Sequence, residues 1–346
     1  MSFAAKVVRW QKQHGRHDLP WQKTRDAYRI WLSEIMLQQT QVAAVIPYYQ
    51  RFLQRFPDIG SLAAATQDEV LTLWAGLGYY SRARNLHRAA QLAVAGHGGR
   101  MPVNFDALLA LPGVGRSTAA AICVFAYGAR HAILDGNVKR LFARHFGIAG
   151  FPGNAQVAAV LWRETERQLP SRDIEAYTQG LMDLGATVCT RSKPRCDVCP
   201  VAPECVALNQ SAIGKYPAPR PRKALPQRHT DMLILLHARQ VLLEKRAPTG
   251  IWGGMWSLPE VPAGTDMIAL CAQRYGAAVA QHEVMPTVAH GFTHFKLDIV
   301  PQRLKVSHVV AHAAAPGVMW LPLEEALGAA IPAPVKRIIA AIAAEK

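Results

Sequence analysis

The distribution of proline and of repeating apolar residues divides this sequence into two parts. From residue 1 to about residue 210, apolar residues recur every three or four positions, which is the spacing of one helix face. Residues 211–228 contain PAPRPRKALP, whose proline and arginine content predicts an extended linker. After the linker the period changes, and short apolar runs such as DMLILLHA predict strands. We therefore expect a multidomain protein: an all-α domain at 1–210 and an α+β domain at 229–346.

The same patterns predict individual elements. In the first domain, helices are expected at 27–46, 67–75, 81–95, 116–127, 137–146, 155–168 and 174–186. In the second domain, the runs at 231–238 and 241–246 predict a hairpin, with further strands at 295–306 and 318–323. Helices are expected at 266–276 and 333–345.

Charge restricts the partners of the chain. Thirty-nine Lys and Arg face 24 Asp and Glu, leaving a net charge of +15, which favours a polyanion such as nucleic acid. The charged N-terminus lacks the apolar core of a secretory signal, and the longest apolar run, STAAAICVFAYGA, is too short to span a bilayer. We expect a cytoplasmic protein, in a bacterium one of the cytosol and nucleoid, with no membrane partner. Its cysteines are then expected as thiols or metal ligands.

Four of the six cysteines lie within 17 residues, in CTRSKPRCDVCPVAPEC. Their spacing, C-x6-C-x2-C-x5-C, suits a zinc ion or an iron–sulfur cluster, and the compact single loop favours [4Fe–4S]. The expected ligands are Cys189, Cys196, Cys199 and Cys205. Cations between them suit contact with phosphate, so we expect the cluster to hold a DNA-binding loop.

Two further stretches carry polar or glycine residues in informative places. LPGVGRSTAAAI places Gly113 and Gly115 before a predicted helix, where backbone N–H groups can approach an anion. WLSEIMLQQTQ places Glu34, Gln38 and Gln41 at i, i+4 and i+7, which puts them on one helix face. Spacing alone favours a solvated polar stripe for that face and an ordinary turn for the glycines.

Together these pieces resemble the helix-hairpin-helix DNA glycosylases of the endonuclease III superfamily, and more closely the adenine glycosylases of the MutY type. The resemblance runs from about residue 5 to about residue 300. The stretches that carry it are LPWQ, WLSEIMLQQTQVAAVIPYY, WAGLGYYSRARNLH, LPGVGRSTAAAI, ILDGNVKR, MDLGATVCTRSKPRC and FTHFKLDI. It implies that the chain flips adenine out of a mispair with 8-oxoguanine or guanine in double-stranded DNA, and hydrolyses its N-glycosidic bond.

The resemblance also implies roles for residues. Glu34 matches the catalytic acid, and Gln38 a residue inserted into the duplex, with Gln41 beside them as a base contact. Asp135 matches the carboxylate that stabilises the sugar cation, although a helix N-cap is an alternative reading of this residue. Asn137 would orient Asp135 or water. A carboxyl group that acts as an acid near neutral pH needs a raised pKa, which an apolar environment provides.

Other matched positions bear on reaction type and on DNA contact. Bifunctional relatives carry Lys where this chain has Ser117, so we expect base removal without strong lyase activity. Lys139 is expected at phosphate. Tyr79 matches a wedge beside the lesion, with a buried core tyrosine as the alternative. Trp21, Gln22 and Gln179 match the lining of the adenine pocket.

The C-terminal domain resembles the nudix fold of 8-oxo-nucleotide hydrolases. The stretch GGMWSLPEVPAGTDMIALCAQRYGA lacks the glutamates that would hold magnesium, so we expect lesion recognition without hydrolase activity. Phe292, Thr293 and His294 stand where the family carries Phe-Ser-His, a loop that probes 8-oxoguanine.

Three competing interpretations remain. The first is an endonuclease III-type glycosylase and lyase for oxidised pyrimidines, against which Ser117 and the additional domain argue. The second is a non-catalytic DNA-binding iron–sulfur protein. The third is a free nudix hydrolase. We expect the chain to act as a monomer.

Overall fold

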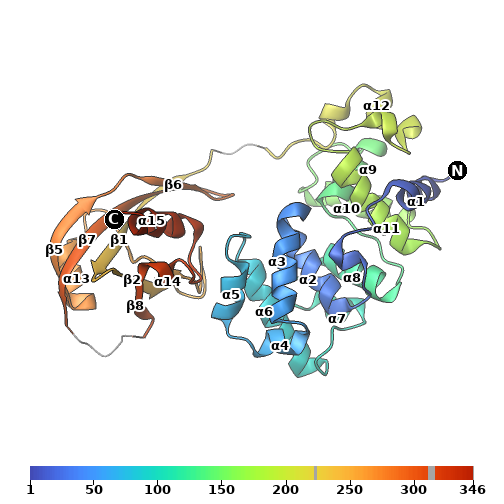
Figure 1. Ribbon diagram of the computed structural model, residues 1–346. Helices are drawn as coiled ribbons and strands as arrows, with labels where there is room; N and C mark the ends of the chain where they lie inside the picture. Colours follow the sequence, from blue (N-terminus) through green and yellow to red (C-terminus); the bar gives the residue numbers. More distant parts are fainter. Residues whose placement is uncertain (222–223, 311–315, 346) are drawn as a thin grey trace. The chain divides into compact units, whose positions relative to one another are not determined.

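The computed structural model describes residues 1–221, 224–310 and 316–345, and its chain divides into two compact units (Figure 1). The helical unit comprises residues 1–64 and 85–222, and the sheet unit comprises residues 65–84 and 223–346. Within the described ranges, no helix combines the length and apolar character needed to cross a bilayer.

The helical unit is built from helices joined by short turns. They are α1 (Phe3–His14), α2 (Ala27–Leu37), α3 (Val42–Arg55), α4 (Ile59–Ala64), most of α6 (Ser81–Gly96), α7 (Phe105–Leu109), α8 (Arg116–Tyr127), α9 (Gly136–His145), α10 (Ala155–Arg167), α11 (Ile174–Asp183) and α12 (Val206–Asn209). A π-helical turn, Leu184–Val188, extends α11, and 3-10 turns lie at Pro20–Gln22, Cys196–Val198, Ala202–Glu204 and Ile213–Lys215.

Side-chain caps fix where several of these helices begin. Asp26 accepts a hydrogen bond from the Tyr28 amide at the start of α2, and Asn154 accepts from Gln156 and Val157 at the start of α10. These oxygens satisfy amides that have no partner inside the helix. The caps therefore determine the positions at which α2 and α10 project their side chains.

One core of the helical unit joins the chain's N-terminus to the cysteine loop. Val7 of α1, Phe142 of α9 and Leu181 of α11 pack in the same buried cluster as Val188 and Cys189. The loop that carries the cysteines is thus anchored on the helices that surround it.

The sheet unit contains an eight-stranded sheet with path order β3-β2-β1-β7-β5. Its strands are β1 (Gln227–His237), β2 (Gln240–Lys245), β3 (Trp256–Ser257), β4 (Glu260–Val261), β5 (Ala277–Val284), β6 (Val288–Gly291), β7 (Lys296–Val309) and β8 (Val318–Pro322). β1 and β7 run parallel, with Leu233 opposite Gln302, and the other pairs are antiparallel. Helices α13 (Met267–Tyr275), α14 (Leu323–Ala326) and α15 (Ala333–Ala343) complete the fold, with α13 on one side of the sheet and α15 on the other (Figure 1).

The remaining part of the sheet unit comes from the N-terminal half of the chain. It holds α5 (Gln67–Trp74), the turn at 75–80 and the first residues of α6. Thr66 and Glu69 form a capping box at the start of α5. This segment brings residues distant in sequence into the same unit as the sheet.

The predicted fold class, a helical domain followed by an α+β domain, is confirmed, whereas some predicted elements are wrong. The predicted helix at 27–46 is two helices, because α2 ends at Leu37 and α3 begins at Val42. Strands β5 and β6 were not predicted, since AAVAQHEV and VAHG contain too little regular alternation. The hairpin β1–β2 and strands β7 and β8 are confirmed.

Candidate active site

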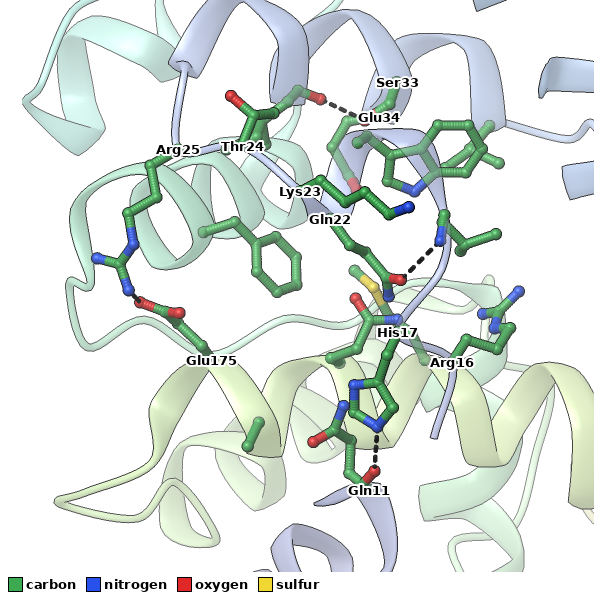
Figure 2. Close-up of a pocket in the computed structure, with 18 of the residues that line it drawn as sticks. Gln11, Arg16, His17, Gln22, Lys23, Thr24, Arg25, Ser33, Glu34 and Glu175 are labelled. Atoms are coloured by element: carbon green, nitrogen blue, oxygen red, sulfur yellow. Dashed lines mark hydrogen bonds and ion pairs between the residues drawn. The ribbon is translucent and has the colours of Figure 1, made fainter. Parts of the chain in front are cut away.

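A pocket of about 710 Å³ opens in the helical unit between α2, α8, α11 and the segment that follows α1. Figure 2 shows its lining, with Glu34 among the side chains of α2 that face it. Four residues predicted from the sequence meet there: Trp21, Gln22, Glu34 and Gln179. The space is large enough for a purine base, and its walls are a mixture of aromatic, amide and charged side chains.

Glu34 is a carboxyl group whose environment differs strongly from water. It lies on α2 between the fully or nearly fully buried residues Ser33 and Ile35, and only part of its side chain is exposed to the pocket. Burial, with a smaller contribution from the negative charge of Asp135, raises the pKa of Glu34 to about 8. A carboxyl group in this state carries a proton at neutral pH and can donate it.

Asp135 precedes α9 and serves as its N-cap. Its Oδ1 accepts a hydrogen bond from the Val138 amide at 2.8 Å. Burial raises the pKa of Asp135, while that bond and the charge of Arg140 act in the opposite direction. The capping interpretation is therefore confirmed.

Arg140, which the sequence interpretation missed, connects this region to the cysteine loop. Its Nη2 donates to Asn137 Oδ1 at 2.8 Å and to the Gly185 carbonyl at 2.6 Å, and its Nε donates to the Cys189 carbonyl at 2.7 Å. The side-chain oxygen of Asn137 thus accepts a hydrogen bond from Arg140. Lys139 lies on the next position of α9 and is half-buried.

The buried carboxylate of Asp183 holds Gln179 in the wall of the pocket. Gln179 Nε2 donates to Asp183 Oδ1 at 2.9 Å, and Asp183, which is fully buried, also accepts from the Arg16 amide and Nε. The Leu19 amide donates to Gln22 Oε1 at 3.2 Å. Sequence reasoning missed Asp183, because a single carboxylate inside a helical stretch gives no signal of burial.

The turn between α2 and α3 corrects one prediction. Glu34, Gln38 and Gln41 do not share a helix face, because Gln38 ends α2 with ψ of 111° and Gln41 is the extended N-cap of α3. Gln38 Nε2 is 3.4 Å from Thr118 Oγ1 on α8. Gln39 is the residue at the tip, with φ of +60°, a conformation rare outside glycine. The stretch QQTQ contains no Gly or Pro, so nothing in it predicted a break.

The predicted hairpin lies between α7 and α8. Gly113 has φ of +78°, and a Cβ there would come within 2.9 Å of Asn85 Cβ. Gly115 is the N-cap of α8, and a Cβ on it would meet nothing within 4 Å. Ser117 Oγ accepts a hydrogen bond from the Leu134 amide at 3.0 Å, which ties the start of α8 to the segment before Asp135.

The remaining predicted DNA contacts lie in the sheet unit. Tyr79 has φ of +49° and is 44% exposed, so the alternative of a buried core tyrosine is wrong. Phe292, Thr293 and His294 form the turn between β6 and β7, where the Phe292 amide donates to the Phe295 carbonyl at 2.9 Å. Thr293 and His294 are exposed, and Phe292 stacks on Phe295 with centroids 4.4 Å apart.

The four predicted cysteine ligands line one small, mostly apolar cavity in the helical unit: Cys189, Cys196, Cys199 and Cys205. Arg144 Nη1 lies 3.4 Å from Cys189 Sγ, and the same guanidinium donates to the carbonyls of Thr190 and Arg191. A buried cation beside the sulfur suits a thiolate that holds a metal. Among the described residues, no group of three or more His, Cys, Asp or Glu side chains has the arrangement that would hold a single metal ion.

Comparisons with known proteins agree with this geometry. Residues 32–167 match the family described as HhH-GPD superfamily base excision DNA repair protein, and residues 231–341 match the NUDIX domain. The helical part resembles a solved thermostable thymine-DNA glycosylase, with a TM-score of 0.54 and 29% identity over 60% of this chain and 95% of that one. A solved endonuclease III–DNA complex, at 20% identity and a TM-score of 0.52, shares the fold over 60% of this chain and 94% of that one.

Relatives of the full length are also found. The adenine DNA glycosylase of Buchnera aphidicola subsp. Acyrthosiphon pisum (strain APS) is 35% identical over 338 residues, which cover 97% of this chain and 96% of the relative. The adenine DNA glycosylase of Homo sapiens is 33% identical over 97% of this chain and 73% of its own length. With a pocket built around a protonated glutamate and relatives matched along nearly the whole sequence, the chain belongs to the adenine DNA glycosylase family.

Proposed function

We propose that this chain removes adenine from 8-oxoguanine·adenine and guanine·adenine mispairs in double-stranded DNA and leaves an abasic site. The observation that carries the proposal is Glu34: a carboxyl group with a pKa of about 8 that faces a base-sized pocket. In this proposal, residues 1–210 perform the chemistry, 229–346 read the lesion, and 211–228 link them. The chain acts as a monomer in the cytosol and nucleoid.

Glu34 is the acid of the reaction. Adenine leaves poorly as an anion, so Glu34 gives its proton to N7, and the electron pair of the C1′–N9 bond then goes to a neutral base. Trp21, Gln22 and Gln179 hold the flipped adenine from the pocket walls, and flipping exposes N7 to the acid. The Glu34 carboxylate that remains can accept a proton from the water that attacks C1′.

Asp135 stabilises the sugar cation that forms as the base leaves. Burial raises the pKa of Asp135, and the Val138 amide and Arg140 act against that shift. In this proposal the ionised form of Asp135 faces the sugar cation while Glu34 holds the proton. Asn137 acts here through Arg140, which fixes its side chain. Because position 117 is serine, no amine is placed there to form a Schiff base, and the product remains an abasic site.

DNA is held at several points. Backbone amides at Gly113 and Gly115 face a phosphate, and the open space around Gly115 lets the backbone approach it. Lys139 and the cations of the cysteine loop neutralise further phosphates. Tyr79 fills the stack beside the lesion, and the turn 38–41 meets the duplex with Gln39 at its tip and Gln38 and Gln41 at its base.

The exposed turn Phe292–Thr293–His294 reads 8-oxoguanine on the opposite strand. Thr293 supplies a hydroxyl and His294 a ring nitrogen for hydrogen bonds, and their Oγ1 and Nδ1 lie 3.5 Å apart. The nudix-like fold is expected to lack hydrolase activity, because the glutamates that would hold magnesium are missing from its sequence.

A [4Fe–4S] cluster is the proposed cofactor, held by Cys189, Cys196, Cys199 and Cys205. Their convergence on one apolar cavity supports it, as does the guanidinium of Arg144 beside a sulfur. When bound, the cluster supplies structural cross-links within the loop rather than a step of the reaction. The chain's own residues, through Arg140 and Arg144, connect that loop to α9.

The test is single-turnover cleavage of a duplex with one 8-oxoguanine·adenine pair. Wild type, Glu34→Gln and a control, Glu325→Gln, which removes an exposed carboxylate from α14 of the sheet unit, are compared with and without an alkaline quench. We expect strand breaks only after alkali in wild type and control, and at least roughly a hundredfold slower base release in Glu34→Gln.

Two results would contradict the proposal. Breaks without alkali would favour the glycosylase and lyase of the endonuclease III type. Failure of folded, iron-loaded wild type to release adenine would favour a DNA-binding protein without this activity.

A further inference from the structure

The loop at 247–255 joins β2 to β3 and contains a buried residue in a strained conformation. Trp252 has φ of +54° and is only 7% exposed. A non-glycine residue in this region is strained and persists only where surrounding contacts hold it. We name residues 247–255 the clamp loop, because its two sides contact different functional segments of the sheet unit.

One side of the clamp loop contacts the turn that carries Phe292. The Trp252 ring lies 5.3 Å from the Phe292 ring and 5.6 Å from the His290 ring, between centroids. Arg246, just before the loop, places its guanidinium 5.6 Å from the Trp252 ring and donates to the Ile251 carbonyl. The indole is therefore enclosed between an anchored cation and the aromatic base of the turn Phe292–His294.

The other side contacts the start of α6. Arg84 Nη1 donates to the Gly253 carbonyl at 2.9 Å, and burial of this guanidinium lowers its pKa. Gly254, with φ of +73°, closes the contact: a Cβ there would come within 2.4 Å of Gln67 Nε2. The positive φ favours glycine at this position, and the flexible end of Gln67 would have to shift to admit a larger residue.

A second contact fixes the same segments. Asp68 of α5 pairs with Lys245 at the end of β2, and its Oδ2 accepts from Trp256 Nε1 at 3.2 Å. The Lys245 ammonium also lies 4.7 Å from the Trp256 ring centre. Both strands that flank the clamp loop are thus attached to α5.

Arg84 lies close to Tyr79 along the chain. The Arg84 amide donates to the Tyr80 carbonyl at 3.2 Å, and the Arg82 amide donates to the Tyr79 carbonyl at 2.9 Å. The guanidinium that binds the clamp loop therefore belongs to the helical turn that presents Tyr79.

We propose that the clamp loop fixes the separation between Tyr79 and the turn Phe292–His294, and that Arg84 is the positioning residue for discrimination between 8-oxoguanine and guanine. This inference rests on the proposed function. Two side chains that contact one lesion site from different segments must be held at a constant distance. The enclosed Trp252 ring provides that rigidity on one side, and the hydrogen bond from Arg84 to the Gly253 carbonyl provides it on the other.

The test compares the single-turnover rate of adenine release opposite 8-oxoguanine with the rate opposite guanine. We expect Arg84→Gln to reduce the ratio of the two rates by about five- to tenfold, which is the size of coupling between residues in contact. Asp68→Asn, which affects a partly exposed side chain and keeps its volume, should reduce it less. Arg88→Gln is the control, since it removes an exposed cation from the same helix and should leave the ratio unchanged.

A double-mutant cycle separates positioning from general loss of DNA binding. If Arg84 acts through the turn, Arg84→Gln combined with Phe292→Ala should lower the ratio no further than Phe292→Ala alone. The proposal would be overturned if the two substitutions lowered the ratio of rates independently, so that their effects multiplied. It would also be overturned if a folded Arg84→Gln enzyme kept the wild-type ratio.

Hydrogen exchange tests the clamp without catalysis. In the free protein, Arg84→Gln should speed exchange of the Phe292 amide several-fold, while amides of α9 keep the wild-type rate. If the wild-type protein released adenine from neither duplex, that result would contradict the proposed function but not the clamp. If the Phe292 amide exchanged at the wild-type rate in Arg84→Gln, that result would contradict the clamp but not the proposed function.

Discussion

The pocket of the helical unit and the turn at Phe292–His294 use polar side chains in opposite ways. In the pocket region, Glu34 and Asp135 are largely enclosed, and burial raises the pKa of both. At the turn, Thr293 and His294 stand in solvent. Under the proposed function, the difference has a physical reason: proton transfer needs an environment that shifts a pKa, whereas lesion reading needs groups left accessible to the partner.

Among the variants below, the largest effect on the reaction rate is expected at the enclosed carboxyl group of Asp135. Asp135→Asn should lower the rate of adenine release by about 10²- to 10³-fold, because the amide cannot offset the charge of the sugar cation. Asn is as good an N-cap as Asp, so the melting temperature should change little. Single-turnover rates with thermal unfolding measure both. A variant with the wild-type rate would leave Asp135 as a helix cap only.

The pH dependence tests the acid itself. Because the pKa of Glu34 is raised to about 8, its proton is present at neutral pH and is lost above that value. The rate of adenine release should therefore fall about tenfold per pH unit on the alkaline side, beginning near pH 8. DNA affinity measured at each pH separates this loss from weaker binding. A flat profile up to about pH 10 would exclude Glu34 as the proton donor.

The same group affects stability. The folded pKa of about 8 exceeds the ordinary value of 4.5, so ionisation destabilises the folded state as pH rises between them, by at most about 5 kcal/mol. Glu34→Gln removes this penalty. Its free energy of unfolding in urea should exceed that of wild type by a margin that widens from about pH 5 to about pH 8. A margin that stays constant would contradict the shift.

The hairpin offers a matched pair of glycines. Gly113→Ala should lower stability by about 1–3 kcal/mol, because it combines a positive φ with a Cβ contact of 2.9 Å to Asn85. Gly115→Ala, at φ of −90° in open space, should cost less stability than Gly113→Ala, because it loses only the N-cap preference of glycine over alanine, and should weaken DNA binding. Urea unfolding and filter binding distinguish them. Equal stability of the two variants would show that the turn relaxes around the added methyl group.

The smallest effect is expected at the exposed turn. Thr293→Ser keeps the hydroxyl, so the preference for 8-oxoguanine over guanine should stay within about twofold of wild type. Thr293→Ala loses one partly solvated hydrogen bond and should reduce the preference about three- to tenfold. Both ratios come from single-turnover rates on the two duplexes. A loss in Thr293→Ser as large as in Thr293→Ala would show that the methyl group matters, not the hydroxyl.

Local pattern predicted much of the fold and part of the site. Helical spacing located most helices, and the cysteine spacing selected four residues that line one cavity. The resemblance selected Trp21, Gln22, Glu34 and Gln179, which line one pocket. These features depend on residues close in sequence or on long motifs.

What could not be predicted depends on tertiary contacts. The break at Gln38 has no breaker residue, and it forms where the chain must turn from α2 into α3. Arg140 donates hydrogen bonds to Gly185 and Cys189, which lie 45 and 49 residues further along the chain. Asp183 accepts from Arg16, which is 167 residues away. The placement of residues 65–84 with the sheet rests on contacts such as Asp68 with Trp256, for which neither residue gives a local signal.

The protonated state of Glu34 has a consequence for the approach to DNA. A duplex is a dense line of negative charge, and an ionised carboxylate in the pocket that faces it would repel it. Because the pKa of Glu34 is about 8, the group is neutral below that pH, and the repulsion is absent when the two molecules meet. The number of counterions released on association should therefore be the same for wild type and Glu34→Gln at about pH 6.5, and should differ at about pH 9.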